Sequence, residues 1–194
     1  LPAQPRSTIA EVSARIAQAR DCGELYSQMG LDYVMNPGGS LDALPADAFD
    51  VVFSMDVLEH VRADSLAASI QEYFRVLKPG GHSLHQIGVD DHLTHYCPSA
   101  SPKQYLAYSD FWWQVLFENG VQYFNRVSYD GFMDLFAAAG FELVDAHAQR
   151  DPSSLLALEI SPQYRMQSAQ SLEATRVYVI HRLSLIHISE PTRL

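Results

Sequence analysis

The sequence predicts an α/β domain with a Rossmann-like, doubly wound and mostly parallel sheet. Apolar, strand-like segments alternate with helical segments along the chain, which is typical of a largely parallel sheet covered by helices. Segment 49–53 is apolar and β-branched without polar alternation, as expected for a strand buried on both faces. Clusters of glycine and proline separate the segments. A chain of 194 residues can bury a sizeable core without disulfides or a structural metal.

Four elements are predicted before residue 82. Ile9, Val12 and Ile16 recur at helical spacing and predict a helix over 8–20, with Ser7 as its N-cap. The apolar run 31–35, closed by the breakers 36–39, predicts a strand, and 49–53 is the strongest strand of the sequence. A helix follows and ends at the stop signal Lys78-Pro79-Gly80-Gly81; its apolar positions are Leu66, Ile70, Tyr73, Phe74 and Leu77.

Four further elements are predicted after residue 82. Residues 84–87 form a weaker strand. Ser128 is expected to cap a helix that ends at Gly140 in the left-handed conformation. Its buried face is predicted to consist of Phe132, Leu135, Phe136 and Ala139. Segments 141–146 and 174–180 complete the predicted strands.

The segment from Gly88 to Tyr129 is too long for an ordinary α/β connection. Ten of the chain's 21 aromatic residues, including both tryptophans, lie between Tyr96 and Tyr129. We therefore interpret 88–129 as an aromatic-rich insertion that forms a lid or a substrate-pocket wall. A small accessory core that packs on the sheet is the other interpretation, and the two are compatible.

Composition excludes two classes of partner. The formal charge of -10 and the presence of only two lysines, Lys78 and Lys103, argue against nucleic acid, whose phosphates need clustered positive charge. No apolar run approaches the roughly 20 residues that span a bilayer, and the first residues do not resemble a secretion signal. We expect a cytoplasmic protein that acts on a small molecule.

Two stretches carry a resemblance to a known family. Residues 49–61 read FDVVFSMDVLEHV, and residues 74–81 read FRVLKPGG. In this order and spacing they resemble class I S-adenosylmethionine-dependent methyltransferases of the small-molecule type. Residues 39–45, GSLDALP, resemble the family's stretch after its third strand, and 129–142 resemble its late helix with the ending AAGFE. The resemblance covers roughly residues 25–182.

The resemblance implies S-adenosylmethionine as cofactor and transfer of its methyl group by in-line displacement. The cofactor would lie over the carboxyl ends of the strands. By position, Ser40 and Leu41 would lie beside the adenine, Ser40 being a weaker acceptor than the acid usual there. Ser54, Met55 and Asp56 would border the methionyl part of the cofactor.

The residues that follow Asp56 face the same opening. Glu59 is expected to line the cofactor site, and His60 is a candidate proton acceptor because imidazole titrates near neutral pH. The alternative is that both residues only cap and orient the following helix. For the acceptor substrate the resemblance suggests contacts from Asp91, His92, Tyr108, Trp113, Asn125 and Arg126, with ordinary surface polar residues as the alternative.

One feature of the family is missing from the sequence. The chain contains no G-x-G triplet, although such a turn lets the backbone approach the cofactor. We expect the first two strands and this turn to lie before Leu1. Residues 1–183 would then be a truncated partial methyltransferase domain, inactive as a fragment. Residues 184–194, SLIHISEPTRL, resemble a translated sequencing adapter and are expected to be an artefactual tail, with a natural tail as the alternative.

The sequence permits three other interpretations. A metal site is suggested by a crowded set of candidate ligands, but none has the spacing of a zinc-binding helix; the set is His82, His85, Asp90, Asp91, His92, His95 and Cys97. We therefore expect no metal. A non-catalytic binding or scaffold module on a degenerate methyltransferase fold is the main alternative. A nucleotide-dependent dehydrogenase does not explain the LEH and RVLKPGG stretches together.

Overall fold

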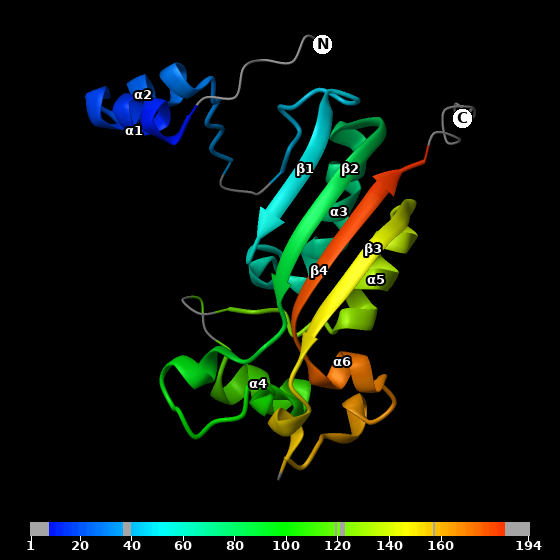
Figure 1. The fold of residues 1–194 in the computed structure, drawn as a ribbon. Helices are drawn as coiled ribbons and strands as arrows, with labels where there is room; N and C mark the ends of the chain where they lie inside the picture. The colour runs from blue at the N-terminus through cyan, green and yellow to red at the C-terminus, as the bar shows by residue number, and fades with distance from the viewer. Residues whose placement is uncertain (1–7, 37–39, 119, 121–122, 157, 185–194) are drawn as a thin grey trace. The chain divides into compact units, whose positions relative to one another are not determined.

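The computed structural model describes residues 8–36, 40–118, 120, 123–156 and 158–184, and it divides the chain into two compact units, 1–39 and 40–194 (Figure 1). None of the helices in these ranges is long and apolar enough to cross a lipid bilayer. Ser7 and the tail residues 185–194, which enter predictions above, lie outside the described residues, whereas Ser184 is described and buried.

The first unit contains two short helices, α1 (Ile9–Gln18) and α2 (Cys22–Met29). Thr8 and Glu11 form a reciprocal capping box at the start of α1, which confirms the predicted helix. The N-cap is Thr8, so the prediction of Ser7 as N-cap is wrong by one residue. Gly30 ends α2 in the left-handed conformation, with φ 66°. The predicted strand 31–35 is wrong, because this segment has no regular structure. Its side chains are exposed, and an extended segment gains little stability without a paired strand.

The second unit is built on a four-stranded sheet, counted over the described residues: β1 (Phe49–Met55), β2 (Leu77–Gly88), β3 (Phe141–Arg150) and β4 (Ala174–Leu183). The strand order is β1-β2-β4-β3 (Figure 1). The Rossmann-like α/β class is confirmed. Among these described strands, however, only β1 and β2 pair in parallel, and the other two neighbouring pairs are antiparallel. Fewer strands pair in parallel than predicted, because β4 lies between β2 and β3 and runs antiparallel to both.

Two helices cover one face of this sheet, α3 (Ala63–Val76) and α5 (Tyr129–Ala138). Leu66 and Ile70 of α3 and Phe132 and Phe136 of α5 are fully buried against the strands, as their spacing predicts. Ser128 caps α5, and Gly140 has φ 93° after its end. Both predictions are confirmed.

The predicted stop signal, residues 78–81, lies within a strand rather than in a loop after the helix. Helix α3 ends at Val76, but residues 78–81 continue as part of β2. The register between β1 and β2 is irregular between Phe49 and Val51, and this irregularity takes up the extra residues. The strand predicted at 84–87 is therefore considerably longer.

Strand β1 is not buried on both faces. Phe53 and Met55 are 73% and 64% exposed, and Val51 is also exposed. Strand β1 lies at the edge of the sheet, and within the described part of the second unit the helices cover only the opposite face. The burial prediction for 49–53 is therefore wrong, and its alternate side chains form an open apolar face.

A second, smaller core lies beyond one end of the sheet (Figure 1). It contains the short helices α4 (Asp110–Leu116) and α6 (Ala169–Glu173) and the 3₁₀ turns η2 (His92–His95), η3 (Gln104–Ala107), η4 (Pro152–Leu155) and η5 (Pro162–Tyr164). Its buried members are Tyr105, Leu106, Trp113, Phe124 and Tyr164. The aromatic segment thus contributes to a second core together with residues after 150, and its interpretation as a lid or substrate-pocket wall stays a prediction.

Candidate functional site

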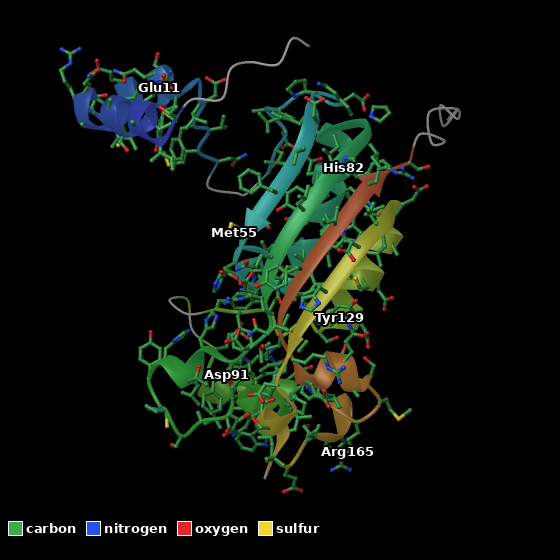
Figure 2. All side chains as sticks on the ribbon, viewed as in Figure 1. Glu11, Met55, His82, Asp91, Tyr129 and Arg165 are labelled. Carbon is green, nitrogen blue, oxygen red and sulfur yellow. The ribbon has the colours of Figure 1, made fainter. Side chains whose placement is uncertain are left out.

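Strand β1 ends at a residue with an unusual backbone. Asp56 has φ 51°, a left-handed conformation that few residues other than glycine adopt. Its N–H donates to the Gln86 carbonyl over 2.9 Å, and Gln86 Nε2 donates to Asp56 Oδ2 over 3.0 Å. Arg176 Nε lies 3.8 Å from Asp56 Oδ1. The carboxylate is thus held in place where β1 and β2 finish, near Met55 (Figure 2).

The next turn, η1 (Leu58–His60), places Glu59 in the interior. Glu59 is 3% exposed, and its Oε1 accepts a hydrogen bond from the N–H of Gly88 over 2.9 Å. A Cβ at Gly88 would lie 2.8 Å from that oxygen, so any other residue there would displace the Glu59 carboxyl group. Burial raises the pKa of Glu59, although the backbone hydrogen bonds lower it in part. Through this bond Glu59 braces the η1 turn against the end of β2, and no side-chain hydrogen bond caps the following helix α3 at its N-cap Arg62. Whether Glu59 lines the cofactor site stays a prediction.

The two ring nitrogens of His60 have different roles: Nδ1 forms a hydrogen bond, and Nε2 can accept a proton. Its Nδ1 lies 2.8 Å from the carbonyl oxygen of Tyr123. Because a carbonyl can only accept, Nδ1 carries the proton, and Nε2 is the nitrogen that can accept another. The ring of His60 lies 5.1 Å from that of His92, measured between centroids.

His92 connects this end of the sheet to a cavity of about 220 Å³. Its ring also packs 5.3 Å from that of Phe124. Burial, with a smaller effect of His60, lowers the pKa of His92, which favours the neutral imidazole. The residues that line the cavity are Asp91, His92, Leu93, Tyr96, Trp113, Leu116, Phe117 and Phe124. All of them come from the aromatic-rich segment.

Three of the six predicted acceptor contacts, Asp91, His92 and Trp113, therefore lie in one cavity wall. Tyr108 lies outside the lining and packs against Phe117, with ring centroids 4.7 Å apart. Whether any of the six residues contacts a substrate stays a prediction.

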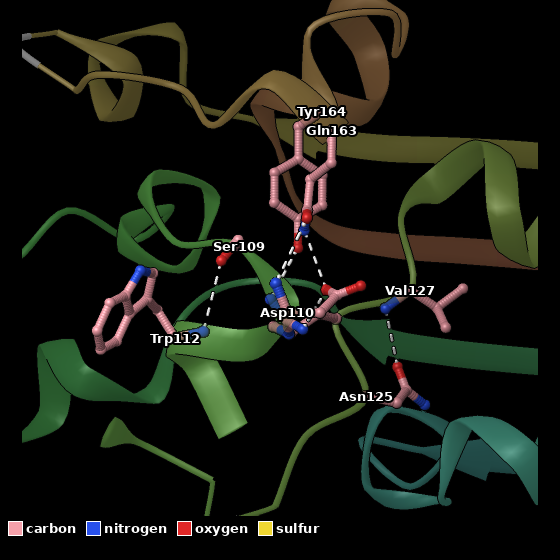
Figure 3. A network of polar contacts seen from close by, with 8 residues as sticks. Ser109, Asp110, Trp112, Asn125, Val127, Gln163 and Tyr164 are labelled. Atoms are coloured by element: carbon pink, nitrogen blue, oxygen red, sulfur yellow. Dashed lines mark hydrogen bonds and ion pairs between the residues drawn. The ribbon is translucent and has the colours of Figure 1, made fainter. Parts of the chain in front are cut away.

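Asn125 uses its side chain to tie two segments together. Its Nδ2 donates to the carbonyls of Leu58 and Val61 over 2.8 and 2.9 Å, and its Oδ1 accepts from the N–H of Val127. Figure 3 shows the last of these bonds. Asn125 thus fastens the η1 turn rather than lining the cavity.

Arg126 supports the cavity wall from behind. Its guanidinium donates to Asp110 over 2.6 Å and to the Tyr164 hydroxyl over 2.9 Å, and it lies 5.1 Å from the centre of the Trp113 ring. Gln163 completes the same network by donating to Asp110 (Figure 3). Arg126 thereby holds the position of Trp113.

The predicted cofactor residues separate into groups. Leu41 lies near the start of β1, because Arg75 at the end of α3 donates to its carbonyl over 2.9 Å. Ser40 precedes it, whereas Asp56 follows the other end of β1, a strand that rises roughly 20 Å. Ser54 points to the helix-covered face, with its Oγ 2.7 Å from His85 Nδ1. Of the six predicted cofactor residues, Met55, Asp56 and Glu59 lie at or just beyond the carboxyl end of β1. The cofactor contacts stay predictions.

One buried cation beside the cavity was not predicted as a site residue. Lys103 is fully buried, and its Nζ donates to the Val89 carbonyl over 2.7 Å and to the Tyr105 hydroxyl over 3.0 Å. Burial lowers the pKa of Lys103 to about 7, while Asp90 and Asp91 act in the opposite direction. No spacing rule in the sequence indicates that this lysine is buried.

Across the described ranges, no three His, Cys, Asp or Glu residues are grouped so that they could hold a metal ion.

Comparisons with known proteins point to one family. The family described as "Methyltransferase domain" matches residues 7–84. No curated protein matches the chain.

Among solved structures, a SAM-dependent methyltransferase from Methanosarcina mazei is 17% identical, with a TM-score of 0.52. The match covers 80% of this chain and 68% of that one. An S-adenosylmethionine-dependent methyltransferase from Mesorhizobium loti is 18% identical, with coverage of 90% and 76% and a TM-score of 0.48. At such identities, the first of these similarities supports a shared fold.

Proposed function

We propose, from the premise that residues 7–84 belong to the methyltransferase domain family, that this protein transfers a methyl group from S-adenosylmethionine to a small-molecule acceptor. The observation that carries the proposal is the continuity between the end of β1 and the aromatic cavity. His60 follows β1 by five residues and contacts His92, which lines the cavity. In sheets of this class, ligands bind at the carboxyl ends of the strands.

The residues at the end of β1 fit one side of the cofactor. S-adenosylmethionine supplies a methyl group activated by a positively charged sulfur. Asp56 provides a fixed carboxylate for a cation, and Met55 and Val57 provide exposed apolar surface. We propose contacts from Met55 and Asp56, with Glu59 as a positioning residue. A role for Ser40 and Leu41 beside the adenine stays a prediction from the resemblance, as does the cytoplasmic location.

The chain's own contribution to the reaction is alignment and proton transfer. Holding an acceptor in the cavity next to the end of β1 converts a bimolecular encounter into an oriented one, which can supply about 7 to 11 kcal/mol. His60 Nε2 would accept the proton that the attacking oxygen or nitrogen loses. Nδ1 stays bonded to the Tyr123 carbonyl during this transfer and keeps the ring oriented.

The scaffold alternative is favoured by one observation, the lack of a G-x-G triplet in the 194 residues. Without such a turn, we expect these residues to bind S-adenosylmethionine more weakly than the micromolar level, about -8 kcal/mol. Weak binding of S-adenosylmethionine at the end of β1 would support the enzyme. Absence of any binding would support the scaffold.

The test is a titration of the 194-residue chain with S-adenosylmethionine, followed by calorimetry and by amide chemical shifts. We expect millimolar binding, with the largest shifts at Met55 and Asp56. Asp56→Asn should weaken binding at least fivefold, whereas Asp145→Asn on distant β3 should not. Unchanged Met55 and Asp56 shifts at 10 mM ligand would contradict the proposed site. A micromolar dissociation constant would show that the pocket does not depend on a glycine turn.

A further inference from the structure

Strand β1 has an edge along which its backbone groups point away from the sheet. Within the described part of the second unit, β1 pairs only with β2 (Figure 1). The N–H of Asp56 donates to the Gln86 carbonyl, and that of Ala48 donates to the Val76 carbonyl just before β2. Because backbone groups alternate in direction along a strand, the even-numbered residues of β1 bond to β2. The N–H and C=O groups of the odd-numbered residues therefore point to the free edge.

This edge of β1 lacks the features that hinder strand pairing. The strand reads FDVVFSM and contains no proline. Its single charged residue, Asp50, forms an ion pair with Lys78 over 2.9 Å. The register irregularity near Phe49 and Val51 places its extra residues in β2, so β1 itself is regular. Edge strands of natural proteins usually carry charges, prolines or bulges that prevent pairing with another chain.

The other edge strand of the described sheet, β3, does carry such features. It reads FELVDAHAQR, with three charged residues in ten. Val144 is an extra residue that interrupts the register with β4, and a second irregularity lies beside Arg150. Pairing is therefore hindered at β3 and not at β1. This difference indicates that the edge of β1 receives a partner strand.

The sequence of β1 is complementary to itself in one antiparallel register. With Val52 opposite Val52 of a second copy, Val51 lies opposite Phe53 and Phe49 lies opposite Met55. These apolar side chains all lie on the uncovered face, where Phe53 and Met55 are exposed. On the helix-covered face Asp50 lies opposite Ser54, so no like charges meet. Apolar pairs directly opposite each other stabilise a sheet, whereas like charges destabilise it.

The backbone selects the same register. It places the odd-numbered residues of the two copies opposite each other in hydrogen-bonded pairs, and every outward-pointing N–H and C=O group of β1 then has a partner. A shift by two residues leaves the end groups without partners. A shift by one residue sets groups that bond to β2 against groups that point outward, and it moves the apolar side chains to the wrong face.

We propose that two copies of this chain associate through β1, antiparallel in this register, with a two-fold axis at Val52. The described sheets of the two copies then form one continuous sheet. Such a contact uses the same surface on both copies and closes after two, because β3 is not free to pair. The inference concerns an interaction surface and does not rest on the proposed function. Association requires no S-adenosylmethionine, so each proposal can fail without the other.

The first test is the oligomeric state of the 194-residue chain without ligand, measured by sedimentation equilibrium between 5 and 500 μM. We expect a reversible change from one chain to two as the concentration rises, because a single strand pair is a small interface. One chain at 500 μM would overturn the proposal. Growth beyond two chains would also overturn it, since further copies need a second pairing edge.

Two double variants test the register. Val51→Glu with Phe53→Glu puts like charges opposite each other in both 51–53 pairs and should weaken association at least tenfold. Val51→Glu with Phe53→Lys makes the same pairs opposite in charge and should associate at least tenfold more tightly than the first variant. Equal association of these two variants would refute the register.

A control separates the strand pairing from net charge. Leu143→Glu with Val144→Glu adds the same charge to β3, where both side chains are 54% exposed, and should change association less than threefold. Weakening equal to that of the Val51→Glu and Phe53→Glu variant would show that overall repulsion governs association, which would overturn the proposal.

A cysteine at the two-fold axis tests the pairing if the charged variants do not fold. Residue 52 lies opposite itself in a non-hydrogen-bonded pair, with Cα atoms about 4.5 Å apart, which a disulfide can span. Val52→Cys, with the free Cys22 and Cys97 replaced by serine, should form disulfide-linked dimers under mild oxidation. Ser54→Cys in the same background lies opposite Asp50 and should form few. No linked dimer from Val52→Cys, or equal yields from both variants, would overturn the proposal.

Discussion

Two buried histidines make the stability of this protein sensitive to mild acid. The ring of His85 lies between two serine hydroxyls, 2.7 Å from Ser54 Oγ and 2.5 Å from Ser83 Oγ. His181 stacks on Phe136 with ring centroids 4.2 Å apart, and its Nδ1 is buried without a partner in the described part of the chain. Burial lowers the pKa of His85 to about 3 and that of His181 to about 4.

The direction of the pH effect on stability follows from the difference in histidine pKa between the folded and the unfolded protein. In the unfolded chain both histidines have a pKa near 6.5, so below that pH the unfolded chain binds protons that the folded protein does not. The stabilising contribution is complete above pH 6.5 and is lost as the pH falls toward 4. Each histidine costs up to about 1.4 kcal/mol per pH unit, or about 4 kcal/mol for both at pH 5. The raised pKa values of Glu59 and Asp91 act in the opposite direction.

Urea unfolding followed by tryptophan fluorescence between pH 7.5 and 5 measures this loss. We expect the free energy of unfolding to fall by several kcal/mol, and His181→Phe to remove roughly half of the pH dependence because phenylalanine cannot be protonated. His147→Phe, at an exposed position of β3, is the matched control and should keep the full dependence. A change below 1 kcal/mol in the unmodified protein, or equal slopes in both variants, would refute the reasoning.

Three further changes test other parts of the structure by the same unfolding measurement. Lys103→Met should remove a rise in stability between pH 7 and about 10, because burial lowers the pKa of Lys103 to about 7 from 10.5 and the unfolded chain binds the extra proton in that window; a retained rise would contradict this. Asn125→Ala should cost about 1–3 kcal/mol, since it removes the side-chain donor from the carbonyls of Leu58 and Val61 and leaves Leu58 only its longer bond from the Val61 N–H, and a loss below 0.5 kcal/mol would argue against its fastening role. Gly81→Ala should cost about 1–3 kcal/mol, because its Cβ would lie 2.8 Å from a backbone carbonyl oxygen. Gly23→Ala in helix α2, where the nearest atom is 3.4 Å away, should be neutral or stabilising, and equal losses in the two glycine variants would refute the steric argument.

The sequence by itself determined the features that depend on neighbours within one helical turn. Helix α5 begins at Ser128, whose hydroxyl accepts from the N–H of Gly131, and Gly140 follows its end. The buried faces of α3 and α5 follow the apolar spacing of Leu66 and Ile70 and of Phe132 and Phe136. Capping and periodicity act between residues three and four apart, so the order of the residues is sufficient to predict them.

Only the tertiary structure decided what depends on distant partners. A strand needs a neighbour, so 31–35 forms none, and β1 is exposed because it has one paired edge and one covered face. The sequence predicts Asn125 and Arg126 as substrate contacts, which stay predictions, and only the structure shows that their side chains also bind backbone carbonyls and Asp110. That Asp91 Oδ2 is buried without a hydrogen-bond partner among the described residues is likewise decided by the tertiary structure. Pairing and burial join residues far apart in the sequence, and no local pattern encodes them.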